Sequence, residues 1–259
     1  MRRISIEHDA GAGTAGSPAS EAVAAAVEVL RAGGVVGLPT DTVYGLAADP
    51  MRKAATDRIF AVKGRPESVD LPVLVAGEDE LEQLVERVTP AARRLVERHW
   101  PGALTLVLPR RADIDLYLGG AGAAGSNQPG QSGAGAASPS QSTNRRPGQG
   151  SGKPATVGVR CPANQVVRAV CREFGPIAAT SANRHGESPF HRADDFERLA
   201  GVDLVIDAGE CAGEPSTVVD LTGDEPTLLR QGGIPWAAVF ETVGPRAPGS
   251  GVGAVDSEA

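Results

Sequence analysis

The sequence has few cysteines, and the three present (Cys161, Cys171 and Cys211) form no CxxC pair. This scarcity predicts reduced thiols in a cytoplasmic protein and no structural zinc site. Long apolar runs are also missing, since none approaches the roughly 20 residues that a membrane-spanning helix needs. The first ten residues lack the apolar core of about 7–15 residues that a secretory signal has. The sequence therefore predicts a cytoplasmic protein without membrane contact.

A surplus of basic residues is absent as well. The formal net charge is −7, whereas a protein that grips duplex nucleic acid by its phosphates carries a basic face. A small basic pocket for one phosphate ligand stays compatible with this charge. No GxxxxGK[ST] motif occurs, and the GxGxxG matches at 11–16 and 120–125 lack the strand before and the helix after that dinucleotide binding requires. His185 and His191 have no partner at metal-ligand spacing, so no protein metal site is predicted.

Short apolar runs alternate with amphipathic segments, which predicts an α/β fold with a twisted, mixed parallel/antiparallel sheet flanked by helices. Strands are expected at residues 3–8, 35–39, 71–77, 103–109, 156–160, 176–180, 202–207, 216–221 and 227–230. Helices are expected at residues 21–32, 52–63, 78–88, 90–100, 164–174, 192–200 and 234–243. Ser20 is expected to cap the first helix, and Gly33 to end it.

Residues 119–152 contain no valine, leucine, isoleucine or aromatic residue. Such a segment cannot bury enough apolar surface to offset the entropy lost on ordering. We predict a disordered insertion between two core strands of one catalytic domain spanning 20–244. Residues 1–19 are expected to form a flexible N-terminal segment, and residues 245–259 a flexible tail.

The stretch GLPTDTVYGLAADP carries three hydroxyls directly after an apolar run. If the chain stays extended, Thr40, Thr42 and Tyr44 share one face, and Asp41 and Val43 share the other. A turn with incidental hydroxyls explains the stretch equally well.

Two further segments place cations beside polar groups. Lys63 and Arg65 suit a phosphate or a carboxylate, although a solvated basic loop is the commoner context of a KxR pattern. In TVGVR, alternation turns Thr156, Gly158 and Arg160 to one strand face and the valines to the core. An ordinary half-exposed strand fits that pattern too.

The last polar segments lie at the ends of predicted strands. Ser181 and Asn183 follow an apolar strand at its carboxyl end, where ligands of open α/β sheets bind. Ser188 follows shortly afterwards, Ser216 begins a strand and Arg230 ends one. If the arginines and hydroxyls converge, they describe an anion pocket.

Seven motifs occur in a single order between residue 35 and about residue 235: PTDTVYGL, KGRP, WPGALTLVL, TVGVRCP, PIAATSAN, PST and LLRQG. Together they resemble the YrdC-type threonylcarbamoyl-AMP synthases (L-threonylcarbamoyladenylate synthases), in the short, single-domain form. The resemblance implies a YrdC-like fold with a concave ligand-binding face. It also implies that L-threonine, bicarbonate and ATP are converted to threonylcarbamoyl-AMP and pyrophosphate, for N6-threonylcarbamoyladenosine modification of tRNA.

Motif by motif, the resemblance implies roles for individual residues. Lys63 and Arg65 would be the catalytic pair. Contacts with threonine would come from Thr42, Arg160, Ala179 and Ser216. Contacts with ATP would come from Lys63, Arg65, Thr156, Ser181, Asn183, Ser188 and Arg230.

The resemblance further implies Mg²⁺ bound with ATP, held mostly by phosphates and water. A tRNA threonylcarbamoyl transferase complex would use the product, with tRNA contact indirect or weak. One alternative is an RNA-binding module of the same fold without synthase activity, which the acidic net charge disfavours. Another is the carbamoyl-transferring role of the related domain in hydrogenase maturation factors. Those proteins contain zinc-finger regions, and the three scattered cysteines of this sequence cannot form one, which disfavours that role.

Overall fold

The computed structural model describes residues 1–6, 16–64, 70–119, 155–211 and 213–244. Arg65, nearly all of the predicted insertion and the predicted C-terminal tail lie outside these residues. Both GxGxxG matches also fall wholly or mostly outside them. The predicted disorder of these segments stays a prediction.

The strands of the described residues form one mixed sheet in the order β1-β8-β2-β3-β7-β4-β6-β5-β9-β10. Their bounds are β1 Arg2–Ser5, β2 Val36–Leu38, β3 Gly45–Ala48, β4 Val73–Leu74, β5 Leu104–Pro109, β6 Thr156–Arg160, β7 Ile177–Ser181, β8 Leu204–Asp207, β9 Thr217–Asp220 and β10 Thr227–Arg230. β8 is parallel to both β1 and β2, whereas β3 is antiparallel to both β2 and β7. The predicted mixed sheet is confirmed.

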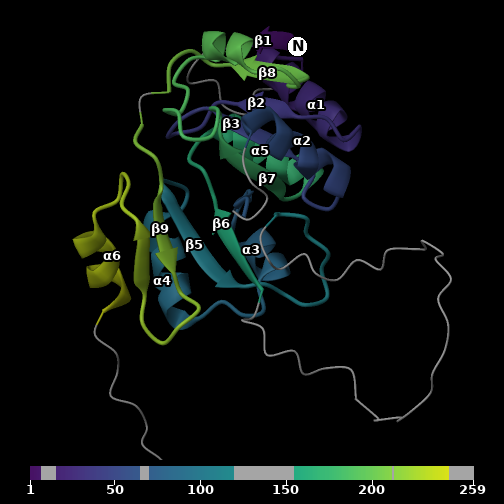
Figure 1. Ribbon diagram of the computed structural model, residues 1–259. Helices are drawn as coiled ribbons and strands as arrows, with labels where there is room; N and C mark the ends of the chain where they lie inside the picture. Colours follow the sequence, from purple (N-terminus) through teal and green to yellow (C-terminus); the bar gives the residue numbers. More distant parts are fainter. Residues whose placement is uncertain (7–15, 65–69, 120–154, 212, 245–259) are drawn as a thin grey trace, which may run out of the picture.

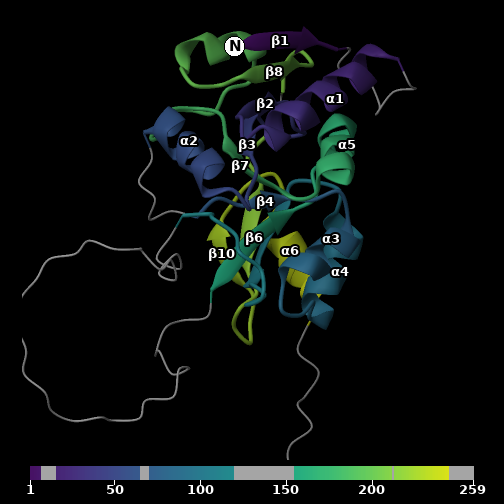
Figure 2. The same cartoon turned by 90° about the vertical axis from the view of Figure 1, so that its right-hand side faces the viewer.

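Helices flank this sheet along its length (Figures 1 and 2). Their bounds are α1 Pro18–Arg31, α2 Lys53–Lys63, α3 Glu78–Leu84, α4 Pro90–His99, α5 Gln165–Phe174 and α6 Trp236–Val243, with a 3-10 helix η2 at Ala193–Arg198. In both views α1 and α5 lie by the strands from β8 to β7. In Figure 1 α3, α4 and α6 lie by β5, β6 and β9. None of these helices is long and apolar enough to cross a membrane.

Strand alternation divides the core into two apolar clusters. In β8, Leu204 and Ile206 pack with α1 and α5, while Val205 packs in the cluster that contains residues of α2, α3 and α4. In β6, Val157 and Val159 are buried in the same cluster as Val205, the one that contains residues of α2, α3 and α4. Because neighbouring residues of a strand point to opposite faces, the other face of β6 is left for the functional site.

The structure differs from the predicted elements in several places. β3 was not predicted, because GLAA carries none of the β-branched or aromatic residues typical of strands. Residues 192–200 were predicted as a helix, but only Ala193–Arg198 form a helix, and it is a 3-10 helix. The strand predicted at 71–77 is reduced to Val73–Leu74.

The start of α1 also differs from the prediction. Ser17, not Ser20, is the N-cap, and its hydroxyl accepts the Ser20 amide hydrogen. Pro18 therefore occupies the first helical turn, where its missing N–H costs no hydrogen bond. The predicted boundary between residues 19 and 20 thus falls inside a helix. At the other end Gly33 follows the C-cap with φ +79°, as predicted for a terminating glycine.

This correction predicts different effects of two alanine substitutions. Ser17→Ala is expected to lower the free energy of unfolding by about 1 kcal/mol, because it removes the side-chain cap. Ser20→Ala should change it by less than about 0.5 kcal/mol, because alanine favours a helix interior. Urea unfolding of both variants tests this, and a larger loss in Ser20→Ala would contradict the assignment of the cap.

Candidate functional site

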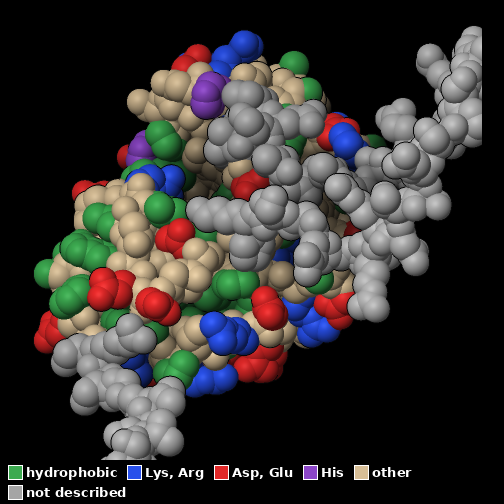
Figure 3. Space-filling model, turned by 60° about the horizontal axis from the view of Figure 1, so that its bottom comes forward, with side chains coloured by type: hydrophobic (Ala, Val, Ile, Leu, Met, Phe, Trp, Pro, Cys, Tyr) green, Lys and Arg blue, Asp and Glu red, His purple; other side chains and the backbone are tan. Residues whose placement is uncertain are grey.

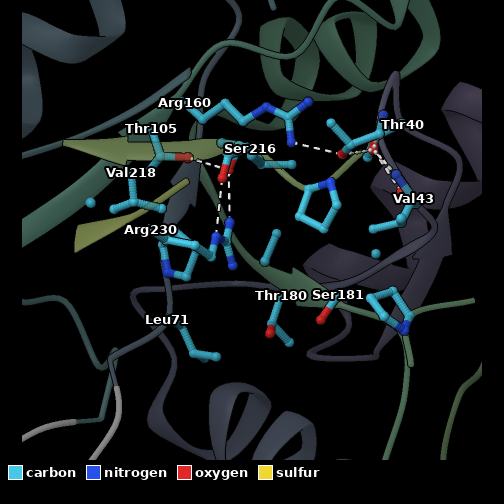
Figure 4. Close-up of a pocket in the computed structure, with 18 of the residues that line it drawn as sticks. Thr40, Val43, Leu71, Thr105, Arg160, Thr180, Ser181, Ser216, Val218 and Arg230 are labelled. Atoms are coloured by element: carbon cyan, nitrogen blue, oxygen red, sulfur yellow. Dashed lines mark hydrogen bonds between the residues drawn. The ribbon is translucent and has the colours of Figure 1, made fainter. Parts of the chain in front are cut away.

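A cavity of about 530 Å³ opens where β6, β7 and β10 end and β9 begins, beside the loop of residues 39–44 (Figure 4). Seven of the residues predicted to bind substrates line it: Thr42, Thr156, Arg160, Ala179, Ser181, Ser216 and Arg230. They come from segments far apart in the chain, so the convergence expected of an anion pocket is confirmed for these residues. Their individual roles stay predictions.

The exposed face of β6 forms one wall of the cavity. Thr156, Gly158 and Arg160 line it, as the alternation predicted. A Cβ added to Gly158 would lie 3.6 Å from Pro72 Cβ and from Thr105 Cγ2. Gly158 therefore leaves open the space into which a larger side chain would project.

Arg160 is held by three groups of the protein. Its Nε donates to the Gly102 carbonyl oxygen at 2.9 Å, and Nη1 donates to Thr42 Oγ1 at 2.9 Å. Nη2 donates to Asp41 Oδ1 at 2.7 Å. The guanidinium is thus oriented by the 39–44 loop and by the segment before β5. Figure 4 shows its bond toward the loop.

The loop of residues 39–44 bends instead of running extended. Thr40 Oγ1 accepts from the Thr42 and Val43 amides, and it lies 2.8 Å from Thr42 Oγ1. The predicted alternation is therefore wrong here, since the bend lets Asp41 and Thr42 both reach Arg160.

Tyr44 does not present its hydroxyl beside the two threonines. Its ring is fully buried against Phe196, and its hydroxyl donates to Gly209 O and accepts from Ala208 N–H. Burial raises the pKa of Tyr44 well above its usual range. The hydroxyl therefore anchors the segment after β8 rather than serving the cavity.

A second polar cluster stands opposite Arg160, around Ser216. Arg230 donates from Nε to the Ser216 carbonyl oxygen and from Nη2 to Ser216 Oγ, both at 3.0 Å. Ser216 Oγ also lies 2.8 Å from Thr105 Oγ1. Partial burial, and then the charge of Arg160, lower the pKa of Arg230. Two cations therefore face one cavity, and an anion between them would relieve their repulsion.

Three other predicted residues lie beside the cavity rather than in its wall. Lys63 is buried, and its ammonium donates to Ser181 O and to Asn183 Oδ1. Asn183 in turn donates from Nδ2 to Glu187 O, while Ser188 is exposed. Lys63 thus stabilises the turn that follows β7. The sequence predicts that this turn presents Asn183 to the nucleotide.

The sequence prediction missed some residues of the wall, of which Thr105 is the most informative. It is buried, faces the cavity and contacts Ser216. A hydroxyl within the apolar strand ALTLVLP was the available signal. Thr180 also lines the cavity, and its hydroxyl within the apolar strand PIAAT is the same kind of signal. Leu71 and Val218 line it too, but their apolar side chains carry no such signal.

The sequence of this chain matches a known protein family. A model of the Sua5, YciO and YrdC family, described as "Telomere recombination", matches residues 28–131 and 138–232. The chain belongs to this family.

Relatives within the family are named as synthases. The threonylcarbamoyl-AMP synthase of Pyrococcus abyssi is 34% identical over 221 residues, which cover 83% of this chain and 55% of that protein. The putative threonylcarbamoyl-AMP synthase of Mycobacterium tuberculosis is 32% identical over 228 residues, covering 87% of this chain and 90% of that protein. This chain therefore spans little more than half of the first relative and most of the second.

A family structure with a bound amino acid shows the same fold. The crystal structure of Pyrococcus abyssi Sua5 complexed with L-threonine matches with a TM-score of 0.71 and 29% identity. The match covers 94% of this chain and 61% of that one. The fold expected from the family resemblance is thereby confirmed.

Proposed function

We propose that the protein is a threonylcarbamoyl-AMP synthase, which converts L-threonine, bicarbonate and ATP to threonylcarbamoyl-AMP and pyrophosphate. The observation that carries this proposal is that Arg160 and Arg230 both line one cavity that is also lined by hydroxyl groups. The names of the relatives, and the threonine bound to one of them, support the same substrates.

The reaction needs positioned anions more than a protein nucleophile. The threonine amine forms a bond to the carbon of bicarbonate, water leaves, and an N-carboxylate results. An oxygen of that carboxylate then attacks the α-phosphorus of ATP, and the bond to the β-phosphate breaks to release pyrophosphate. Holding both anions in line and neutralising their charge supplies most of such catalysis.

Different residues of the cavity wall fit two of the three substrates, threonine and ATP. Arg160, with Thr42 beside it, would bind the threonine carboxylate, since a guanidinium matches a carboxylate with two parallel hydrogen bonds. Ala179 and Ser216 would complete the threonine site. Arg230 would bind ATP phosphates.

The remaining ATP contacts surround the end of β7. Ser181 and Thr156 line the cavity and would meet the nucleotide directly. Lys63 would keep the turn after β7 in place through Asn183, a bond that the structure shows. Arg65 and Ser188 complete the proposed set, with Arg65 assigned from the sequence alone.

Mg²⁺ is part of this proposal. Among the residues that the structure describes, the cavity wall contains one carboxylate, Asp70, together with several hydroxyls. This set fits an ion held mostly by phosphate oxygens and water, because Mg²⁺ keeps several waters when bound with a nucleotide. Bound with ATP, the ion would neutralise phosphate charge. We further propose that a tRNA threonylcarbamoyl transferase complex uses the product.

The activity is tested with purified protein, ATP, L-threonine and bicarbonate, each omitted in turn. We expect pyrophosphate release and a threonylcarbamoyl-AMP mass only when all three are present. Pyrophosphate release that is independent of threonine, or no release at all, would contradict the proposal. In that event a salt-dependent tRNA titration would test the RNA-binding alternative, although acidic and basic side chains are interspersed on the face drawn in Figure 3.

A further inference from the structure

The ion pair between Asp41 and Arg160 lies behind the wall of the cavity. Only 8% of the Arg160 side chain and 19% of the Asp41 side chain are exposed. Arg160 lines the cavity, whereas Asp41 is not one of its lining residues. Asp41 is therefore placed to act on a ligand in the cavity through Arg160, whose guanidinium it contacts.

Asp41 itself is held rigidly. The same oxygen that accepts from Arg160, Oδ1, also accepts from the Ala163 amide at 3.0 Å, just before the N-cap of α5. On its backbone side, a Cβ added to Gly213 would lie only 2.2 Å from the Asp41 carbonyl oxygen. Close backbone packing thus fixes the loop that carries the carboxylate.

Hydrogen bonds to the protein leave part of the Arg160 guanidinium available. A guanidinium has five N–H groups. Three of them donate to Gly102, Thr42 and Asp41. Within the part of the chain that the structure describes, one N–H remains on each terminal nitrogen, which is the number that a single carboxylate needs for two parallel hydrogen bonds.

The two arginines of the cavity differ in how their charges are balanced. Arg160 has a carboxylate partner at 2.7 Å. The bonds that the structure shows for Arg230 go to the carbonyl and the hydroxyl of Ser216, which are both neutral. A polyphosphate, with several negative charges, gains more from an uncompensated cation than a single carboxylate does. The phosphates should therefore favour Arg230, and the carboxylate should favour Arg160.

We propose that Asp41 is a positioning residue that reserves Arg160 for the carboxylate of the amino-acid substrate and keeps the nucleotide phosphates away from it. This inference rests on the proposed function. It assigns to Asp41 both the orientation of the guanidinium and the balance of its charge.

The test compares the steady-state kinetics of Asp41→Asn with those of the wild type. An amide at position 41 can still accept hydrogen bonds from Arg160 and Ala163, but it removes the negative charge. With its charge no longer balanced, Arg160 should attract the ATP phosphates, which then compete there with the threonine carboxylate. At saturating ATP we therefore expect the apparent KM for threonine to rise about tenfold or more, while the KM for ATP and kcat stay within about threefold. Pyrophosphate should in addition become a competitive inhibitor against threonine. It should inhibit Asp41→Asn at least about tenfold more strongly than it inhibits the wild type.

A matched control is Asp203→Asn. Asp203 also pairs with an arginine, Arg58, and accepts a backbone amide hydrogen, from Val35, but it does not line the cavity. This variant should keep both KM values of the wild type. Asp41→Glu, which restores the charge one methylene group away, should recover part of the affinity for threonine and suppress inhibition by pyrophosphate.

The outcomes separate this inference from the proposed function. A wild-type protein that does not use threonine refutes the proposed function. If the wild type is active but Asp41→Asn has the same threonine KM and the same inhibition by pyrophosphate, the role of Asp41 is refuted and the proposed function stands. An equal rise of the KM values for threonine and ATP in Asp41→Asn also refutes the role of Asp41. If Asp41→Asn does not fold, Asp41→Glu is compared with the wild type. A rise of about threefold in the threonine KM alone then supports the inference, and any other result overturns it.

Discussion

Arg160→Ala is expected to lower kcat/KM for threonine by at least about a thousandfold, because the positioned cation for the substrate carboxylate is lost. The same substitution should lower the free energy of unfolding by about 3–5 kcal/mol, since it leaves the largely buried Asp41 carboxylate without its partner. Stopped assays of pyrophosphate release and urea unfolding measure the two effects separately.

A double substitution distinguishes lost chemistry from lost stability. In Arg160→Ala combined with Asp41→Asn, the unpaired buried charge is gone, so most of the stability should return while activity stays low. Arg160→Lys keeps a charge, but the ammonium has its three N–H donors on one nitrogen and cannot place them as the planar guanidinium places its five, so we expect it to be far less active than the wild type. Threonine-dependent activity within tenfold of the wild type in Arg160→Ala would remove this residue from the site.

Gly158→Val is expected to reduce kcat/KM for threonine and for ATP by about a hundredfold or more. The free energy of unfolding should change by less than about 1 kcal/mol. Valine favours a strand more than glycine does, which compensates for local crowding. The position of a Cβ there is free of clashes, at 3.6 Å from Pro72 Cβ and from Thr105 Cγ2. The further methyl groups would extend into the cavity and occupy substrate space.

Gly158→Ala provides the matched control for size. Its single methyl group makes ordinary contacts, so the loss of activity should be clearly smaller than in Gly158→Val. Circular dichroism and urea unfolding check that both variants fold. A folded Gly158→Val protein with normal activity would show that the reaction takes place outside this cavity.

Local patterns were sufficient for much of the fold. Period-2 alternation assigned Val157 and Val159 to the core and Gly158 and Arg160 to the cavity, because a strand turns successive side chains to opposite faces whatever its neighbours are. Thr89 caps α4 directly before Pro90, and such a cap can be recognised from the sequence because an N-cap acts within its own turn.

Predictions failed where a local pattern had two solutions. Ser17 and Ser20 are both plausible caps, and the position of Pro18 decides for the first. β3 has weak strand propensity and is a strand because β2 and β7 pair with it on both sides. This pairing also places Gly45 opposite Ser181, which joins the 39–44 loop to the turn after β7.

The sequence by itself determined the family and the alternation of β6, and it singled out seven of the residues that line the cavity, because these depend on residue type and on spacing over a few positions. Only the tertiary structure decided what the polar groups contact. Asp41 pairs with Arg160 across 119 residues, and the Tyr44 hydroxyl bonds to Gly209 across 165. Such partners are selected by burial, since a polar group removed from water must bond with whichever complementary group the folded chain places beside it.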